Sequence, residues 1–471
     1  MTRSLRHSPA TLRPPAAAVF SRFTVELHDG DVPDIVRDAA ALHLLDTLGC
    51  GLAAHALGVA GQGQVAAAED GGARQATAIG VAERVPAHAA ALANGMLCHG
   101  LDFDDTHTAS ICHISAVVCP AALAAGEAAG ATGRDVITAI VAGTELVAAI
   151  GEAAAPSYMR TGFHPTGVCG VFGAAAAAAR LRKLSAPAAA SALGIAGSMA
   201  SGLFEYLADG SETKPIHAGW AAHGGVVAAR LADAGATGPP TVLEGRFGLF
   251  STYYNDPKPE LTRGLGKIWE TPRVAVKAYP ACHFVHSCLD AAAGLRAAHA
   301  VQPEDITEVV VSIPAPGVPL VLEPRDAKIA PRTPYDAKFS LPYSVATMLV
   351  RGRVNLASYT ESAIADPQVL ALAERVRYEP RDFPTFPAAF PGSVSITTLE
   401  GTFRAEVPHQ RGGPENSMTT GEVREKFREN AALALADADV ERLESAVLGL
   451  DAAPDLDEMG ILRAAQGGSN R

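Results

Sequence analysis

The sequence is poor in aromatic and charged residues. Among its 471 residues only 6% are aromatic and 19% are charged, whereas 48% are hydrophobic and runs of alanine recur. Alanine has the highest helix propensity, and its small side chain lets helices approach closely. We therefore expect a mainly α-helical protein with tight packing between small residues. A chain of this length corresponds to about two or three domains.

Long uncharged hydrophobic runs are also missing. The most apolar stretch, residues 136–155, contains Glu145 and Glu152. No window of about 18 residues lacks both charges and helix breakers, so we expect no membrane span. The formal net charge is −12, from 38 basic and 50 acidic residues. Nucleic acids and anionic membranes bind basic surfaces, so neither is an expected partner, although a local basic pocket would not show in this sum.

Motifs for metals and cofactors are missing as well. The seven cysteines include no CxxC pair, which is typical of reduced, buried residues in a cytoplasmic protein. The sequence contains no HxH, HExxH, Walker A or GxSxG motif. We therefore expect neither a metal nor a cofactor.

The first 23 residues are basic and contain Arg3, Arg6, Arg13 and Arg22 without an acid. Such a composition can mark an organelle transit peptide, but the adjacent prolines 14 and 15 would interrupt its helix. We expect a disordered leader over residues 1–23.

The amino-acid composition changes along the chain and divides it into two kinds of segment. Ala-rich helical patterns cover residues 32–57, 86–99, 115–130, 133–154, 167–181, 185–201 and 217–233, and a helical tail covers 420–450. Between them, 306–313 is β-branched and 394–398 with 402–407 predicts a hairpin, while 343–351, 361–365 and 367–376 predict helices. We expect one all-helical domain built from residues 24–266 and 409–471, and an inserted α+β domain at 267–408.

The densest polar group in the Ala-rich half lies near the end of a predicted helix. If that helix continued, His99, Asp102 and Thr106 would share one face and Asp104 would point away. Three carboxylates within four residues repel one another and raise one pKa unless a cation or hydrogen-bond donors compensate. With His113 nearby, the group indicates acid–base chemistry or, less strongly, a metal site. The alternative is a solvated helix end.

Two further groups precede predicted helices. His164 lies before a helix that starts near Gly167, where backbone N–H groups suit an anion. Lys214 and His217 open the helix over 217–233, and a lysine beside a histidine can hold a carboxylate and act as an acid. We expect His223 to be structural.

A fourth group stands where the composition changes. Lys277, Cys282, His283 and His286 lie at the predicted entry to the α+β domain, and pockets favour such junctions. The alternative is ordinary domain packing. A weaker polar group contains Arg332, Tyr335, Asp336, Lys338 and Ser340.

These groups, in this order, resemble the MmgE/PrpD family, which includes 2-methylcitrate dehydratases, cis-aconitate decarboxylases and iminodisuccinate epimerase. The matching segments span roughly residues 35–430 and read ANGMLCHGLDFDDTH, FHPTGVCGVFGAAAAAARL, SMASGLFEYLADGSETKPIHAGWAAHGG, VKAYPACHFVHSCLDA and PYDAKFSLPYSVA. The resemblance implies a large helical domain with a smaller α+β lid, a homodimer, and cofactor-free chemistry on small polycarboxylates at the domain interface.

The resemblance also implies the site. It places the catalytic residues at Asp102, His113, His164 and Lys214, and the substrate-binding residues at Thr106, His217, Lys277 and His283. Within that set, we expect Asp102 and His113 to be the acid–base pair and His164 to orient or protonate the substrate.

We expect a lyase, first of all a dehydratase of a hydroxy-polycarboxylate. A decarboxylase or an epimerase of the same fold is the alternative, and a non-catalytic carboxylate-binding protein is a remote one. Two departures from the family pattern bear on this choice. His113 is followed by Ile-Ser rather than Pro-Ser, and Cys282 stands fifth after Lys277, near where the decarboxylases have a histidine, with His283 one further.

Overall fold

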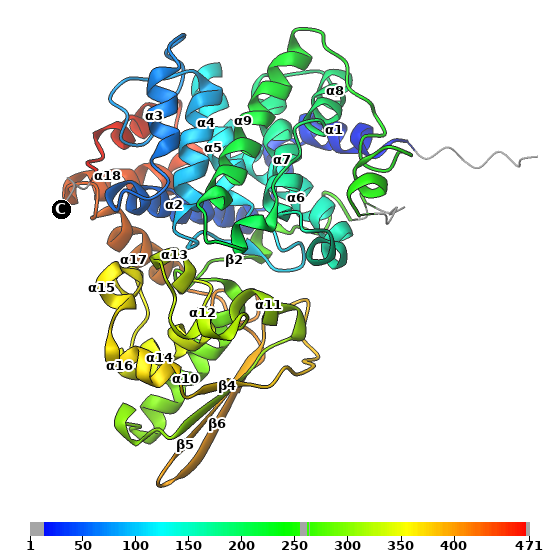
Figure 1. Ribbon diagram of the computed structural model, residues 1–471. Coiled ribbons are helices and arrows are strands. Elements are labelled where there is room, and N and C mark those ends of the chain that lie inside the picture. The colour runs from blue at the N-terminus through cyan, green and yellow to red at the C-terminus, as the bar shows by residue number, and fades with distance from the viewer. Residues whose placement is uncertain (1–13, 255–260, 263, 468–471) are drawn as a thin grey trace, which may run out of the picture.

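The computed structural model describes residues 14–254, 261, 262 and 264–467. Figure 1 shows a large helical body and, beside it, a smaller body that contains a sheet. The expected mainly helical fold is confirmed, and the C-terminal part contains a small mixed sheet. The helical body contains α1 (Ala16–Glu26), α2 (Asp34–Ala56), α3 (Gln62–Glu69), α4 (Ala87–Gly100), α5 (Ser115–Ala129), α6 (Gly133–Thr161), α7 (Pro165–Leu181), α8 (Ala186–Ala196) and α9 (Thr213–Asp233).

The first helix corrects one expectation. Residues 16–23 were expected to be disordered, but they form most of α1, which packs against α8. The side chain of Phe20 is fully buried in the core, which explains why the chain becomes helical directly after its two prolines. The remainder of the predicted leader, residues 1–13, lies outside the described residues.

Small residues bring the central helices together. α9 packs against both α4 and α7. Where α4 crosses α9, a Cβ atom added to Gly95 would lie 2.8 Å from the Cα atom of Gly219, so only glycine permits this distance. The high alanine and glycine content thus has a direct structural use.

α6 lies within this core. Its residues 133–154 are long and apolar enough to cross a membrane, yet 83% of an 18-residue apolar window within them is buried inside the protein. Other parts of the protein therefore cover most of the surface of this helix.

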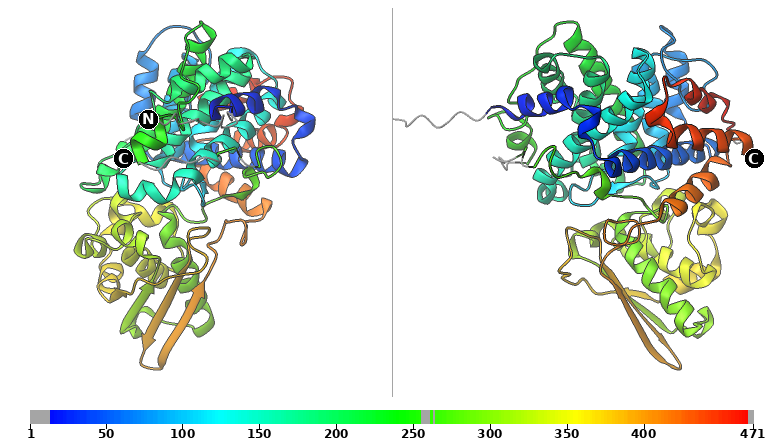
Figure 2. Two further views of the ribbon diagram at one scale, coloured as in Figure 1. Left: turned by 90° about the vertical axis from the view of Figure 1, so that its right-hand side faces the viewer. Right: turned by 180° about the vertical axis from the view of Figure 1, so that it is seen from behind.

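The end of the chain returns to the helical body. α17 (Thr420–Ala431) and α18 (Asp437–Leu448) both pack against α2. Phe427 and Leu443, which are fully buried, share one hydrophobic core with residues of the first nine helices. Figure 2 shows these C-terminal helices against the helical body from behind.

The smaller body, here called the lid, has its own hydrophobic core. Its sheet has the order β4–β3–β5–β6, with β3 parallel to β4 and the other pairs antiparallel. In Figure 2 the β5–β6 hairpin projects away from the helical body. The lid elements are α10 (His286–His299), β3 (Glu308–Ser312), α11 (Val318–Val321), α12 (Arg325–Ile329), α13 (Pro334–Ala337), α14 (Leu341–Arg351), α15 (Glu361–Ile364), α16 (Pro367–Ala373), β4 (Val376–Tyr378), β5 (Gly392–Thr398) and β6 (Gly401–Val407).

Three short strands were missed. The helix predicted over 367–376 ends at Ala373, and Val376 begins β4, whose three residues pair with β3. The helical body is also not purely helical, since β1 (Thr106–His107) pairs antiparallel with β2 (Val274–Ala275). Two-residue strands carry no alternation pattern to read. This short ladder joins the loop after α4 to the segment that enters the lid.

Candidate functional site

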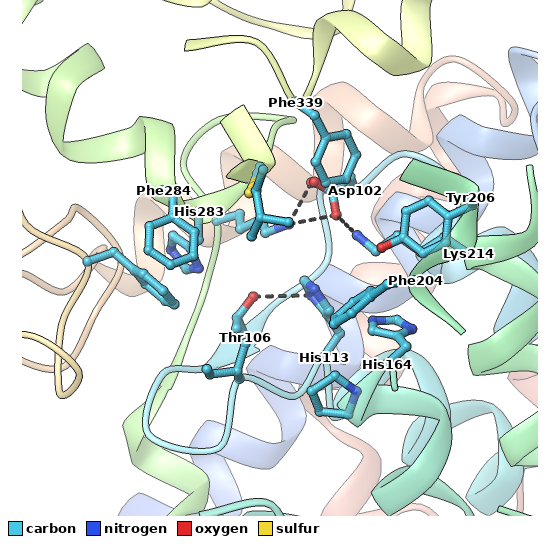
Figure 3. Close-up of a pocket in the computed structure, with 16 residues that line it drawn as sticks. Asp102, Thr106, His113, His164, Phe204, Tyr206, Lys214, His283, Phe284 and Phe339 are labelled. Carbon is cyan, nitrogen blue, oxygen red and sulfur yellow. Dashed lines mark hydrogen bonds and ion pairs between the residues drawn. The ribbon is translucent and has the colours of Figure 1, made fainter. Parts of the chain in front are cut away.

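A pocket lies between the helical body and the lid (Figure 3). About 560 Å³ of non-atom space, part of it open to solvent, lies between its walls. The helical body and the lid both contribute to its wall. The lining residues include Asp102, Thr106, His113, His164, Phe204, Tyr206 and Lys214 from the body and Lys277, Cys282, His283, Phe284, Phe339 and Phe390 from the lid side.

The loop after α4 carries the first acid in a strained conformation. The helix ends at Gly100, and Asp102 adopts a left-handed φ of +52°. The prediction that His99, Asp102 and Thr106 share a helical face is therefore wrong, although Asp102 and Thr106 both reach the pocket. Asp104 does not point away either, because its Oδ2 lies 2.7 Å from Nδ1 of the buried His99.

Asp102 is paired with two lysines. Lys214 forms a short ion pair with Oδ1 of Asp102, and Lys277 Nζ lies 3.1 Å from the same oxygen. Burial would raise the pKa of this carboxyl, but the two ammonium groups outweigh burial and hold the pKa well below its usual range. Oδ2 is buried without a hydrogen-bond partner among the residues that the structure describes. The site therefore holds a buried Asp102 carboxylate that two lysine side chains contact, with a carboxylate oxygen of Asp104 within 4.8 Å of it.

His113 is held as a neutral imidazole with a defined tautomer. Its Nδ1 lies 2.9 Å from the Asp105 carbonyl oxygen and 3.1 Å from Thr106 Oγ1. A carbonyl only accepts, so Nδ1 carries the hydrogen and Nε2 keeps its lone pair. Burial first, and then the positive charges of Lys277 and Lys214, hold the pKa of His113 well below its usual value. His113 can therefore act as a base at neutral pH.

His164 and His217 form a second pair. His164 caps the start of α7, and its Nδ1 lies 3.1 Å from Nδ1 of His217 on α9. Burial lowers the pKa of both rings, that of His217 to about 4 and that of His164 well below its usual value. Two neutral rings can share one hydrogen between these nitrogens. His217 thus lies behind His164 and fixes its orientation rather than lining the pocket.

Two groups of side chains have the proximity needed for a metal ion. One contains His99, His113 and His164, and the other contains Asp102, Asp104 and His113, with ligand atoms within 4.8 Å of one another in each. The second group is engaged, since Asp102 binds the two lysines. In the first group His99 contacts Asp104 through Nδ1, and its Nε2 has no hydrogen-bond partner among the described residues. Two ammonium groups at such a site oppose a divalent cation electrostatically. The donor set therefore fits an anionic ligand better than a metal.

The lid side of the pocket is mostly apolar. Phe284, Phe339 and Phe390 line it, and the ring of His283 stacks on Phe390 with centroids 5.1 Å apart. Burial keeps His283 neutral by lowering its pKa, and burial raises the pKa of the Cys282 thiol. Apolar walls strengthen the charge interactions of the lysines by excluding water.

The structure thus brings seven of the eight predicted residues to one pocket, and the eighth, His217, contacts His164. His223 lies elsewhere, stacked on Trp220 with centroids 5.1 Å apart. Sequence reasoning missed Tyr206 and Phe339, which also line the pocket. Burial raises the pKa of the Tyr206 phenol, so it remains a hydroxyl donor. Aromatic side chains between polar motifs were the only signal for these residues, and core packing explains such residues equally well.

Comparisons with known proteins identify related chains. A human cis-aconitate decarboxylase is 33% identical over 396 residues, which cover 80% of this chain and 79% of that protein. A cis-aconitate decarboxylase from Aspergillus terreus is 28% identical, covering 80% and 81% of the two chains. A cis-aconitate decarboxylase-like protein from Aspergillus oryzae is 28% identical over 464 residues, covering 94% and 96%.

Family models account for both bodies of the molecule. The MmgE/PrpD N-terminal domain matches residues 18–262, and the MmgE/PrpD C-terminal domain matches residues 279–452. The pocket residues come from both matched regions. With both domains present, in order and facing one pocket, the chain belongs to the MmgE/PrpD family.

Proposed function

We propose that this protein is a lyase that decarboxylates a small unsaturated tricarboxylate of the cis-aconitate type. The observation that carries the proposal is the pair of lysines on Asp102, which brings two cationic side chains to a pocket that also contains two neutral histidines. The relatives named as cis-aconitate decarboxylases favour this reaction over the dehydration expected first from the sequence.

Substrate binding follows from charge. Lys214 and Lys277 can each donate a charge-assisted hydrogen bond to a substrate carboxylate, and Thr106 adds a hydroxyl. A bound polyanion also stabilises the protonated form of nearby imidazoles, because an opposite charge raises their pKa. His113 and His164, which are neutral in the free protein, would therefore take up a proton when the substrate binds.

The same groups support the chemical step. The bond between the substrate and one carboxylate breaks, CO2 leaves, and the electron pair spreads over the adjacent alkene and carboxylates. Lysine ammonium groups stabilise this developing negative charge. The proton loaded on His113 or His164 is then delivered to carbon, so the overall reaction consumes one proton and releases one CO2.

Dehydration of a hydroxy-polycarboxylate is the second candidate. The rings of His113 and His164 lie with centroids 6.2 Å apart, and His113 Nε2 is free to accept a proton. A base and an acid at this separation suit removal of a proton and a hydroxyl from neighbouring carbons.

We propose a homodimer for the assembly, to be tested by light scattering.

A substrate panel tests the proposal. The purified protein is incubated in D2O with cis-aconitate, citrate, 2-methylcitrate and iminodisuccinate, and proton NMR and CO2 release are followed. We expect CO2 from cis-aconitate with one solvent deuteron in the product. A new alkene from citrate or 2-methylcitrate without CO2 would replace decarboxylation by dehydration, and deuterium exchange without net conversion would indicate epimerisation. Thermal stabilisation by a tricarboxylate without turnover would indicate a binding protein.

A further inference from the structure

Three consecutive backbone carbonyls after α4 each accept a hydrogen bond from a different lysine. Lys338 Nζ lies 2.7 Å from Leu101 O, Lys277 Nζ lies 2.9 Å from Asp102 O, and Lys426 Nζ lies 2.8 Å from Phe103 O. The three lysines come from distant parts of the chain and are at most 6% exposed. Burying an ammonium group is costly unless it is well paired, so this arrangement needs a reason.

The reason lies in the loop that the lysines hold. Asp102 has a left-handed φ of +52°, a conformation that aspartate adopts more readily than most residues with a Cβ atom but that still costs free energy. Its Oδ1 receives Lys214 and Lys277, and its Oδ2 remains unpartnered in the described structure. The direction of this carboxylate therefore depends on groups that fix the backbone on both sides of it.

Lys338 differs from the other two lysines in its position. Lys426, on α17, is paired with Asp46 at 2.7 Å, and Lys277 is paired with Asp102 itself. Lys338 belongs to the lid, between α13 and α14, and within the described parts of the chain it forms no ion pair with a carboxylate. Its ammonium binds carbonyl oxygens and lies 5.1 Å from the centre of the Tyr359 ring.

Lys338 also joins the two walls of the pocket. Besides Leu101 O, its ammonium donates to Pro280 O at 3.1 Å, and its backbone carbonyl accepts from Cys282 N at 2.9 Å. The residue thus fixes the loop of Asp102 on one side and the segment that carries Cys282 and His283 on the other. Loss of this ammonium would release both walls together.

We propose that Lys338 is a positioning residue that couples the seating of the lid to the orientation of Asp102. With the lid seated, its ammonium fixes Leu101 O and the Asp102 carboxylate meets Lys214 and Lys277. Without that contact the loop loses its support from the lid. The inference deepens the proposed function, since it assigns to the lid a part in assembling the same site.

The charges around Lys338 agree with this role. Burial lowers the pKa of Lys338 to about 7, Asp102 opposes that change, and Lys277 and Lys214 add to it. The thiol of Cys50 also faces the same region. Asp102 thus favours the charged form of Lys338, the form that donates to the Leu101 carbonyl, which couples this lysine to the loop that it holds.

The test compares Lys338→Met, Lys338→Gln and Lys338→Arg with the exposed lid variant Arg353→Met, all in the full chain. Amide hydrogen exchange is measured by mass spectrometry for peptides that cover residues 99–107 and 276–284. We expect faster exchange in both peptides for Lys338→Met and Lys338→Gln, recovery toward the wild type for Lys338→Arg, and no change for Arg353→Met. Gln is included because its side chain is polar but neutral and shorter than that of lysine, so it provides a second test if Met prevents folding.

Kinetics give the second readout. With the substrate that the wild type converts, we expect kcat to fall by about 100-fold in Lys338→Met with a smaller change in KM, and Lys338→Arg to restore most of kcat. Unchanged exchange in both peptides for a folded Lys338→Met or Lys338→Gln variant overturns the inference. If the wild type converts no substrate, the proposed function fails, while the exchange measurement still decides the role of Lys338.

Discussion

Lys277 holds Asp102 at two points, with its Nζ 3.1 Å from the side-chain Oδ1 and 2.9 Å from the backbone oxygen. Lys277 follows directly on the β-ladder that leads into the lid, whereas Asp102 belongs to the helical body. One ammonium group therefore fixes both the backbone and the carboxylate of the residue at the centre of the pocket. Lys214 completes the arrangement from the first turn of α9.

The first prediction concerns the charge of Asp102. In Asp102→Asn the carboxylate that Lys214 and Lys277 share is lost, so the repulsion between their two ammonium groups is no longer compensated in this buried site. We expect kcat/KM to fall by at least about 100-fold, as for loss of a preorganised charge contact. Steady-state kinetics of CO2 release measure the effect. The exposed Asp209→Asn is the matched control, and equal activity of the two variants would contradict the role given to Asp102.

A second prediction concerns metals. The pocket has two groups with ligand-like proximity, but Lys214 and Lys277 place positive charge beside both. We expect activity to survive dialysis against a strong chelator, and added zinc or manganese to give no increase. Loss of turnover after dialysis, restored by one metal, would show that the histidines bind an ion. Metal content by mass spectrometry provides the independent check.

The third prediction concerns pH and stability. His217 has a pKa of about 4 in the folded protein, because burial and the neighbouring His99 and Lys214 disfavour its charged form, whereas its ordinary value is 6.5. The unfolded chain therefore binds more protons than the folded one between these values. The stabilising effect of keeping His217 neutral is complete above pH 6.5 and is lost as pH falls toward 4.

Replacement by asparagine tests this directly. His217→Asn keeps a polar partner for His164 but cannot titrate, so its melting temperature should fall less steeply than that of the wild type between pH 6.5 and 4. Thermal unfolding at closely spaced pH values gives the two slopes. Parallel curves would show that His217 does not titrate with the predicted shift.

The fourth prediction concerns the close contact of α4 and α9. Gly95→Ala would place a Cβ atom 2.8 Å from the Gly219 Cα atom, and the helices would have to separate. We expect the free energy of unfolding to fall by about 1–3 kcal/mol. In contrast, Gly294→Ala on α10 meets nothing within 4 Å and should gain up to about 1 kcal/mol. Denaturant titrations that rank the two variants in the opposite order would contradict this account of the packing.

The sequence supported much of the fold because the Ala-rich helices have clear beginnings. Ser185 caps α8 as its position before Pro187 predicts, and the β5–β6 hairpin turns at residues 399–400, directly before Gly401. The loop 101–105 could not be predicted in this way. Its conformation depends on Lys338, Lys277 and Lys426, which lie far away in the sequence, so local periodicity wrongly extended the helix through Asp102.

The candidate site shows the same division. Histidines and lysines that stand alone in apolar segments were visible as candidates, and resemblance to a family collected them into one set. Their partners were not visible, since the bond of His164 to His217 and the short ion pair of Lys214 with Asp102 each join separate helices and loops. Nor did spacing reveal Tyr206, whose place in the pocket wall depends on the short helical turn before α9.

One measurement tests the central claim most directly. The wild type and Lys214→Met are given cis-aconitate in D2O, and CO2 release and deuterium in the product are quantified in the same sample. We predict one CO2 and one carbon-bound deuterium for each molecule consumed by the wild type, with the rate reduced by at least about 100-fold in Lys214→Met. Consumption of cis-aconitate without CO2 release would contradict decarboxylation. Full activity of Lys214→Met would contradict a site built on the lysines that contact Asp102.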